Sequence, residues 1–279
     1  MLTNQRVIFD DDGTENDLSV DLNDFRGSAV TFDYVAADDK LYVGSDLPLN
    51  HLWIEIETAN DAASVASVEI WYNNDWIAAV DVLDHTAAAG VSLAQSGIIQ
   101  WKTNRDKGWD REQDSEVVTG ITKVGIYDYY WLRINFSADL NALTEIKHLG
   151  HKFATDAVLY TYYPDLNNAN IKTAFASGKT DWKDQHFMAA ENIIFDLKKS
   201  DIIISPSQIL DYEIFEKPAV HKIAEIIYRG MGRAYNENRE NARKEYNENF
   251  NQTFFNIDLN RNANLSDRER RQRAGFIGR

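Results

Sequence analysis

The spacing of apolar residues changes from strict alternation to a helical period near residue 155, and this change constrains the fold more than any other feature. Before it, short alternating runs are separated by Gly, Asn, Asp and Ser, a pattern typical of antiparallel strands. After it, apolar residues recur every three or four positions, as on the buried face of a helix. We therefore expect an α+β protein, with a β-sandwich domain over residues 1–155 and an all-α domain over residues 156–279.

The run 52–57 illustrates the alternation. Leu52, Ile54 and Ile56 share one face of the predicted strand, and Glu55 and Glu57 share the other. We expect this strand to be half-buried, with the glutamates on its open face. Further strands are predicted at 98–101, 123–127, 130–136 and 146–153, together with a hairpin that joins 68–72 to 76–80. Their even spacing favours an antiparallel sandwich of the jelly-roll or immunoglobulin-like kind.

Three helices dominate the predicted second domain. Asp181 suits the N-cap of a helix that runs to about Leu197. A cap at Ser205, with Pro206 and Gln208 behind it, begins another helix. Pro218 then begins one long helix, on the order of 55 Å in length. Its aromatic surface exceeds what a small helical domain needs to bury, so we expect part of it to face a neighbouring molecule: Tyr228, Tyr235, Tyr246, Phe250, Phe254 and Phe255.

Composition excludes several classes of protein. The 279 residues contain no cysteine, which excludes disulfides, thiolate metal sites and a cysteine nucleophile. A formal net charge of −15 argues against general nucleic-acid binding, and we expect no sequence-specific nucleic-acid partner. No apolar run approaches the roughly 20 residues needed to cross a bilayer, and residues 1–6 lack the apolar start of a secretory signal. We expect a protein made in the cytoplasm with no membrane partner.

The most specific local pattern lies at 258–269. With Asp258 as position 1, Asn260, Asn262 and Asn264 fall at positions 3, 5 and 7, and Glu269 falls at position 12. This is the ligand spacing of an EF-hand calcium loop, in which hard oxygen ligands wrap around the ion. We name these five residues as candidate metal ligands and calcium as the candidate cofactor.

The same stretch has a second interpretation that needs no metal. Position 6 of the loop is Ala263, where the EF-hand turn favours glycine, and Asp258 and Glu269 are the only carboxylates among the candidate ligands. Ser266 and Glu269 also form a capping box that would begin a helix by itself.

Catalytic signatures are missing from the sequence. It has no Gly-rich phosphate loop, no Gly-x-Ser-x-Gly elbow and no His-Glu-x-x-His motif. His148 and His151 are close together, but an offset of three on a strand places them on opposite faces, which suits a shared metal poorly. We expect the chain not to be an enzyme.

Six tryptophans lie in the predicted β domain, and exposed tryptophans can form a platform for sugars. We expect at least half of them to be buried between the sheets, and we name Trp76 and Trp109 as candidate glycan-facing residues. A carbohydrate-binding or receptor-binding function is therefore one alternative for this domain.

Charge is divided unevenly along the chain. Residues 217–279 carry 13 basic and 8 acidic residues, whereas residues 1–216 carry 16 basic and 36 acidic residues. The last segment is basic and contains the apolar pair Phe276–Ile277. It is either a solvated, exposed terminus or a segment that docks on an acidic neighbour or near packaged DNA. The residues that we expect to contact such a partner are Arg268, Arg270, Arg271, Arg273, Phe276, Ile277 and Arg279.

Taken together, these segments resemble proteins of tailed-bacteriophage virions. The similarity lies in the runs 67–77 and 130–134 of the β domain, and in 208–211, 219–228 and the 258–269 loop of the helical domain. The helical part resembles the head–tail adaptor proteins of the phage neck. This resemblance implies a structural protein that forms a ring of about twelve copies beneath the portal protein and contacts tail or neck proteins. The alternative is a virion protein that binds a carbohydrate or receptor through its β-sandwich.

Overall fold

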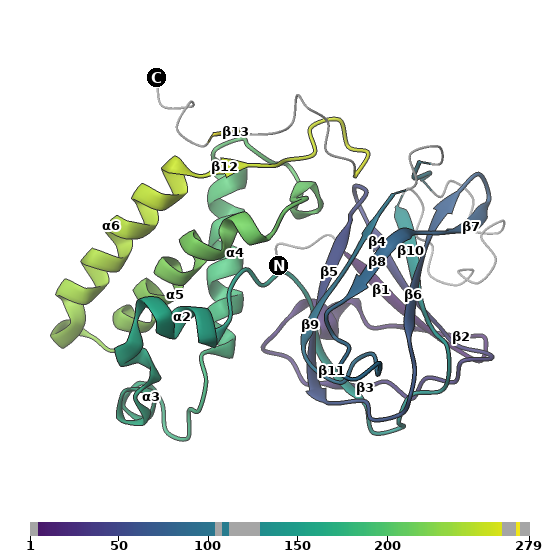
Figure 1. The fold of residues 1–279 in the computed structure, drawn as a ribbon, viewed down its shortest axis with the longest axis horizontal. Coiled ribbons are helices and arrows are strands. Elements are labelled where there is room, and N and C mark those ends of the chain that lie inside the picture. The colour runs from purple at the N-terminus through teal and green to yellow at the C-terminus, as the bar shows by residue number, and fades with distance from the viewer. Residues whose placement is uncertain (1–4, 104–107, 112–128, 264–271, 274–279) are drawn as a thin grey trace.

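The computed structural model describes residues 5–103, 108–111, 129–263 and 272–273. Two regions lie side by side (Figure 1). The β region, residues 6–150, contains both large sheets, and the helical region, residues 156–252, contains the longer helices. Antiparallel sheets followed by helices confirm the predicted α+β class.

The β region consists of two antiparallel sheets that pack face to face. The first sheet has the order β2-β1-β4-β10-β6-β7, with β1 Arg6–Asp11, β2 Thr14–Asp17, β4 Lys40–Ser45, β6 Ala66–Tyr72, β7 Asp75–Ala78 and β10 Tyr130–Phe136. The second has the order β3-β11-β5-β9-β8, with β3 Val30–Thr31, β5 His51–Thr58, β8 Val80–Asp84, β9 Gly97–Lys102 and β11 Glu145–Gly150. A short helix, α1 Ser19–Asn23, follows β2.

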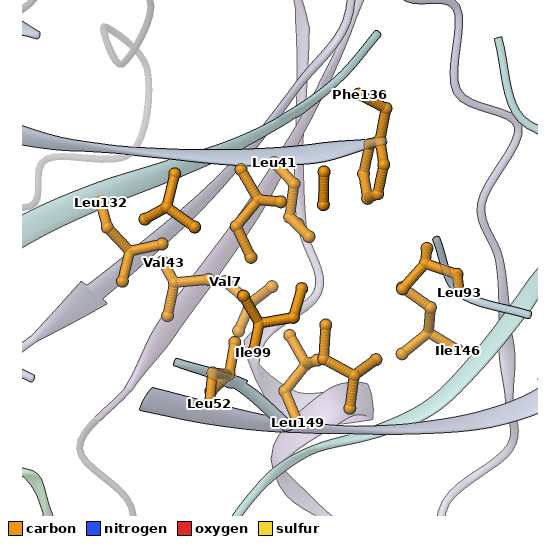
Figure 2. Close-up of a cluster of buried hydrophobic side chains, with 14 of the residues drawn as sticks. Val7, Leu41, Val43, Leu52, Leu93, Ile99, Leu132, Phe136, Ile146 and Leu149 are labelled. Carbon is orange, nitrogen blue, oxygen red and sulfur yellow. The ribbon is translucent and has the colours of Figure 1, made fainter. Parts of the chain in front are cut away.

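Apolar side chains from both sheets meet in one core. Figure 2 shows Val7, Val43 and Leu132 from the first sheet near Leu52 and Ile99 from the second. These side chains are 0% exposed. The alternation in the sequence therefore places one face of each strand in this core.

The predicted hairpin is confirmed as β6 and β7. Trp71 pairs with Trp76 across the strands, and Asn73 and Asn74 form the connection with φ angles of 51° and 58°. Two consecutive residues with positive φ match the right-handed twist of the flanking strands, and asparagine tolerates this conformation better than most residues do. The strand predicted at 123–127 lies outside the described residues.

The helical region has its own core, and two of its longer helices are α4 Lys183–Lys199 and α5 Glu216–Gly230. Shorter elements precede and separate them: α2 Asp156–Tyr162, η1 Pro164–Asn167, α3 Ala169–Phe175, η2 Pro206–Gln208 and η3 Glu213–Phe215. The capping box at Ser205 and Gln208 is present, but the helix it begins is a single 3₁₀ turn. The prediction of a longer helix there was wrong, because the backbone turns extended at Ile209 and pairs with Ile257 instead.

The prediction of one long helix from Pro218 was also wrong. The chain forms α5 and then α6, Asn236–Gln252, with the 3₁₀ turn η4 Arg233–Tyr235 between them. Gly232 lies at the break with φ 83° and ψ −159°, a conformation that only glycine adopts readily. The reversal lets α6 pack beside α5, so Tyr228, Tyr246 and Phe250 are buried within their own chain. These three aromatic residues therefore do not face a neighbouring molecule.

Gly232→Ala should lower the free energy of unfolding by about 1–3 kcal/mol, because a Cβ disfavours this backbone conformation although the space around it is open. Gly108→Ala is the matched control, since it also has open space and lacks a positive φ. Urea denaturation of both variants measures the difference. An equal effect at the two sites would contradict the role assigned to Gly232.

Candidate functional site

The loop that begins at Asp258 folds around its own carboxylate. Asp258 is 0% exposed, and its Oδ1 and Oδ2 accept hydrogen bonds from the backbone N–H groups of Asn262 at 3.1 Å and Ala263 at 2.7 Å. Ala263 has a φ of 56°, in the left-handed region where an EF-hand sequence has glycine. Both carboxylate oxygens thus hold the turn closed.

This loop is attached to the segment 205–211 on the helical side. Ile257 forms a bridge with Ile209, the Asp258 N–H donates to the Gln208 carbonyl at 2.9 Å, and the Gln208 side-chain amide donates to the Asp258 carbonyl at 2.7 Å. At its far end, Ala263 is buried in the core of the β region. The loop 256–263 is therefore held by both regions.

Only some of the candidate metal ligands lie among the described residues. Asp258, Asn260 and Asn262 lie in this loop, and Asn264 and Glu269 lie outside the described residues. Among the residues that the structure describes, no group of three or more His, Cys, Asp or Glu side chains is arranged to hold a metal ion. The calcium site remains a prediction.

The basic C-terminal segment follows the loop. Arg273 belongs to a two-stranded ribbon in which β13 Gln272–Arg273 pairs antiparallel with β12 Phe254–Phe255. The ribbon lies beside the helical region, above α4 in the view of Figure 1. The remaining residues predicted to bind a partner lie outside the described residues: Arg268, Arg270, Arg271, Phe276, Ile277 and Arg279.

All six tryptophans of the β region are 9% exposed or less, but they occupy three different places. Trp101 and Trp109 lie in the core between the sheets, and Trp53 lies where the two regions meet. Trp71, Trp76 and Trp131 form a separate cluster on the other face of the first sheet. The prediction that at least half of them lie between the sheets was therefore wrong.

The two candidate glycan-facing residues differ in their surroundings. The Trp109 indole N–H donates to the Thr103 hydroxyl at 2.8 Å. Trp76 packs against Tyr42, and the Arg133 guanidinium lies 4.8 Å from its ring centroid. Each side chain is 9% exposed, which leaves little indole surface for a sugar to stack on.

A buried carboxylate connects the β region to the helical region. Glu55 on β5 is 1% exposed, and its carboxylate lies 3.1 Å from the Lys183 ammonium and 3.5 Å from the Lys152 ammonium. It also accepts a hydrogen bond from the Trp53 indole N–H at 3.0 Å. Burial by itself would raise the pKa of Glu55, but the two lysines and the indole hold it below its ordinary value.

The expectation that Glu55 lies on an open strand face was therefore wrong. The outer face of β5 is covered by α4, whose Phe187 packs with Phe25, Trp53 and Ile98. The Lys152 ammonium lies 4.7 Å from the Trp53 ring centroid and 5.5 Å from that of Phe187. We call this contact between the two regions the junction.

Hydroxyl and amide groups extend the junction toward 205–211. The hydroxyls of Ser45 and Ser207 are 2.6 Å apart, and the Ser205 hydroxyl donates to the Asp46 carboxylate at 2.6 Å. The Asn50 side-chain amide donates to the Leu210 carbonyl at 3.0 Å. The junction is thus an apolar and ionic contact with a row of polar contacts beside it.

His148 and His151 lie beside one hollow of the junction. Phe25, Phe187 and Ile194 help to line this hollow, and both histidines face it. The expectation that they lie on opposite faces of one strand was wrong, because β11 ends at Gly150 and His151 follows it.

The sequence did not predict that Glu55, Lys152 and Lys183 meet at the junction. Glu55, Lys152 and Lys183 are far apart in the chain and look like ordinary surface charges. The available signal was Trp53, a large aromatic residue on the same strand face as Glu55, because such a face is suited to being covered by the helices that follow. The partners themselves follow only from the three-dimensional packing.

Comparisons with known proteins add no relative. No protein-family model matches the chain, no curated protein is detectably similar to it, and no solved structure resembles it. Among the described residues, none of the helices combines the length and apolar character required to cross a membrane.

Asp258→Asn should lower the free energy of unfolding by about 1–3 kcal/mol in calcium-free buffer, because one of the two backbone N–H groups that Asp258 binds loses its acceptor. Thermal and urea denaturation with and without calcium measure the change. An increase in Tm on adding calcium to the wild type, and not to Asp258→Asn, would support the EF-hand interpretation. An unchanged stability of the variant would contradict the capping role of Asp258.

Glu55→Gln should lower the free energy of unfolding by about 3 kcal/mol, because it leaves the largely buried Lys152 ammonium without a carboxylate partner. Glu57→Gln, an exposed glutamate two residues along the same strand, is the matched control and should change stability by less than about 0.5 kcal/mol. Urea denaturation at neutral pH compares the two. Equal effects would show that the buried ion cluster contributes nothing specific.

Proposed function

We propose that this protein is a structural component of a tailed-phage virion, of the head–tail adaptor kind that joins the portal to the tail. In this proposal the helical region lies at the portal and the β region lies outward. The protein acts as a ring of about twelve copies, and its basic C-terminal segment docks on an acidic surface of a portal, tail or neck protein.

The observation that best supports this proposal is the way the basic segment is attached. The loop 256–263 is hydrogen-bonded to 205–211 on the helical side, and its residue Ala263 is buried in the core of the β region. Five arginines follow within the last twelve residues of the chain: Arg268, Arg270, Arg271, Arg273 and Arg279. A charged docking segment that starts at a fixed place on a well-packed body can meet a complementary partner surface in a defined register.

The junction supports the same interpretation. A carboxylate buried between two ammonium groups, an aromatic cluster and a row of hydroxyl contacts fasten the two regions together. An interface of this kind holds two domains in one relative orientation better than a polar, hydrated interface would. A spacer between a portal and a tail requires such a fixed body.

Deletion of the gene in its phage should yield filled or leaking heads without tails, because the portal would lack its connection. Electron microscopy of the particles measures this outcome. Complete tailed particles that fail to adsorb would contradict the adaptor role and favour the alternative, a carbohydrate-binding or receptor-binding virion protein.

A substitution in the chain tests the docking segment itself. Arg270→Gln with Arg271→Gln should strongly reduce complementation of the gene deletion, because charge complementarity at the partner would be lost. Arg239→Gln with Arg243→Gln removes the same charge from the exposed surface of α6 and should complement normally. Equal complementation by both pairs would remove the role of the C-terminal arginines.

A further inference from the structure

Buried histidines that the proposed function does not use gather at the junction. His51, at the start of β5, is 4% exposed, and His151, just after β11, is 7% exposed. Their ring centroids are 5.4 Å apart with the planes at 72°. The rings pack on Tyr212 and Phe153, which precede η3 and α2, so the pair lies between the two regions.

The pair has few hydrogen-bond partners. Nδ1 of His51 is 2.8 Å from the Asn50 side-chain oxygen, while its Nε2 is buried without a partner. Both ring nitrogens of His151 are buried without a partner. Adding a proton to either ring would create a buried charged N–H group with no acceptor, which is unfavourable in an apolar contact.

Groups around the pair that carry a positive charge, or would carry one when protonated, reinforce this effect. From β5 and β11, His51 and His148 face His151, and from α4 Lys198 acts on it with the same sign of charge. Glu191 of α4 lines the neighbouring hollow. Burial lowers the pKa of His51 to about 4, and burial together with His51, His148 and Lys198 lowers that of His151 to about 3.

We propose that the His51–His151 pair makes the junction acid-labile, so that protonation of the two rings separates the β region from the helical region while each keeps its own core. Both rings are neutral in the closed state and gain protons once water reaches them. Acid therefore favours the open state by mass action, without any ligand.

The expected pH window follows from the sign of the shifts. Exposed histidines titrate near pH 6.5, and the folded pKa values are lower, so the closed state binds fewer protons below pH 6.5. Closure is fully favoured above that pH and weakens as the pH falls toward 4. Each histidine can raise the opening equilibrium constant up to about tenfold per pH unit, so the pair can raise it up to about 100-fold per pH unit.

Other titratable groups lie near the junction, and burial also lowers the pKa of His148 and His186. Despite burial, Lys152, Lys183 and the Trp53 indole hold the pKa of Glu55 below its ordinary value, so this carboxylate stays largely ionised down to pH 4.8. Burial lowers the pKa of His148 to about 4, although its Nδ1 lies 2.8 Å from the Leu22 carbonyl and Glu55 and Asp24 are nearby, so His148 adds to the acid response of the pair. His186 is bonded to Asp156 at 2.7 Å within the helical region, and Lys152 also acts on it.

Hydroxyl-radical footprinting of the full chain between pH 7.5 and 4.8 tests the proposal. Oxidation of Phe187 and Tyr212 at the junction should rise below pH 6.5. Oxidation of Trp131 in the β region and of Trp182 in the helical core should stay constant, since both are 0% exposed and remain buried in their own regions. A simultaneous rise at all four sites would mean global unfolding and would overturn the proposal, as would no rise at all.

Two variants separate titration from packing. His151→Leu keeps a side chain of similar volume and cannot gain a proton. The rise in Phe187 oxidation as the pH falls should therefore be less steep, by up to about tenfold per pH unit. His51→Gln should do the same and serves if His151→Leu fails to fold. His85→Gln replaces an exposed histidine and should leave the pH profile unchanged. A wild-type profile in both junction variants would overturn the proposal.

Discussion

The buried carboxylate of Glu55 is the constraint on which the relation between the two regions depends. A carboxylate that is 1% exposed is tolerated only when cationic groups and hydrogen bonds replace the water it has lost. Here the cations come from the link that follows β11 and from the first turn of α4. The β region therefore cannot bury this strand face favourably unless the helical region supplies Lys183. This shared ion pair ties the two regions together.

The contact around Glu55 also determines what surrounds the histidine pair. Because Phe187 of α4 packs against the β region, the residues at the ends of β5 and β11 are enclosed as well, and those residues include His51 and His151. The junction thus contains titratable groups in two opposite states. Glu55 is charged and paired in the closed state, whereas the histidines are neutral and largely unpaired. Only the histidines respond to mild acid.

Much of the architecture follows from local sequence patterns. Alternation predicts β5, β6, β9, β10 and β11 because a strand that faces one core must place every second residue in it. The sequence also indicates the α+β order and the hairpin at Asn73. It fails at the 216–252 segment because the apolar spacing continues through Met231, and a single Gly232 conformation redirects the helix. Periodicity reports which face is buried and says nothing about a reversal between two helices with the same period.

The candidate site was harder to predict, for a different physical reason. Asp258 could be recognised because its loop is local, and the capping bonds to Asn262 and Ala263 span only five residues. The environments of Glu55 and His151 could not be recognised, because they are supplied by residues far away in the sequence. Lys183 pairs with Glu55, and His51 packs against His151. Alternation assigns Glu55 to a solvent-exposed face because it separates the two faces of a strand but does not show that a helix, α4, covers the outer one.

The junction and the C-terminal loop are physically coupled. The loop 256–263 is held on one side by 205–211 and on the other by the burial of Ala263 in the β region. The same 205–211 segment contacts Ser45, Asp46 and Asn50 across the junction. If the two regions separate, the loop must release one of its two attachments, because it cannot follow both. The place from which the basic segment leaves the body is therefore defined only while the junction is closed.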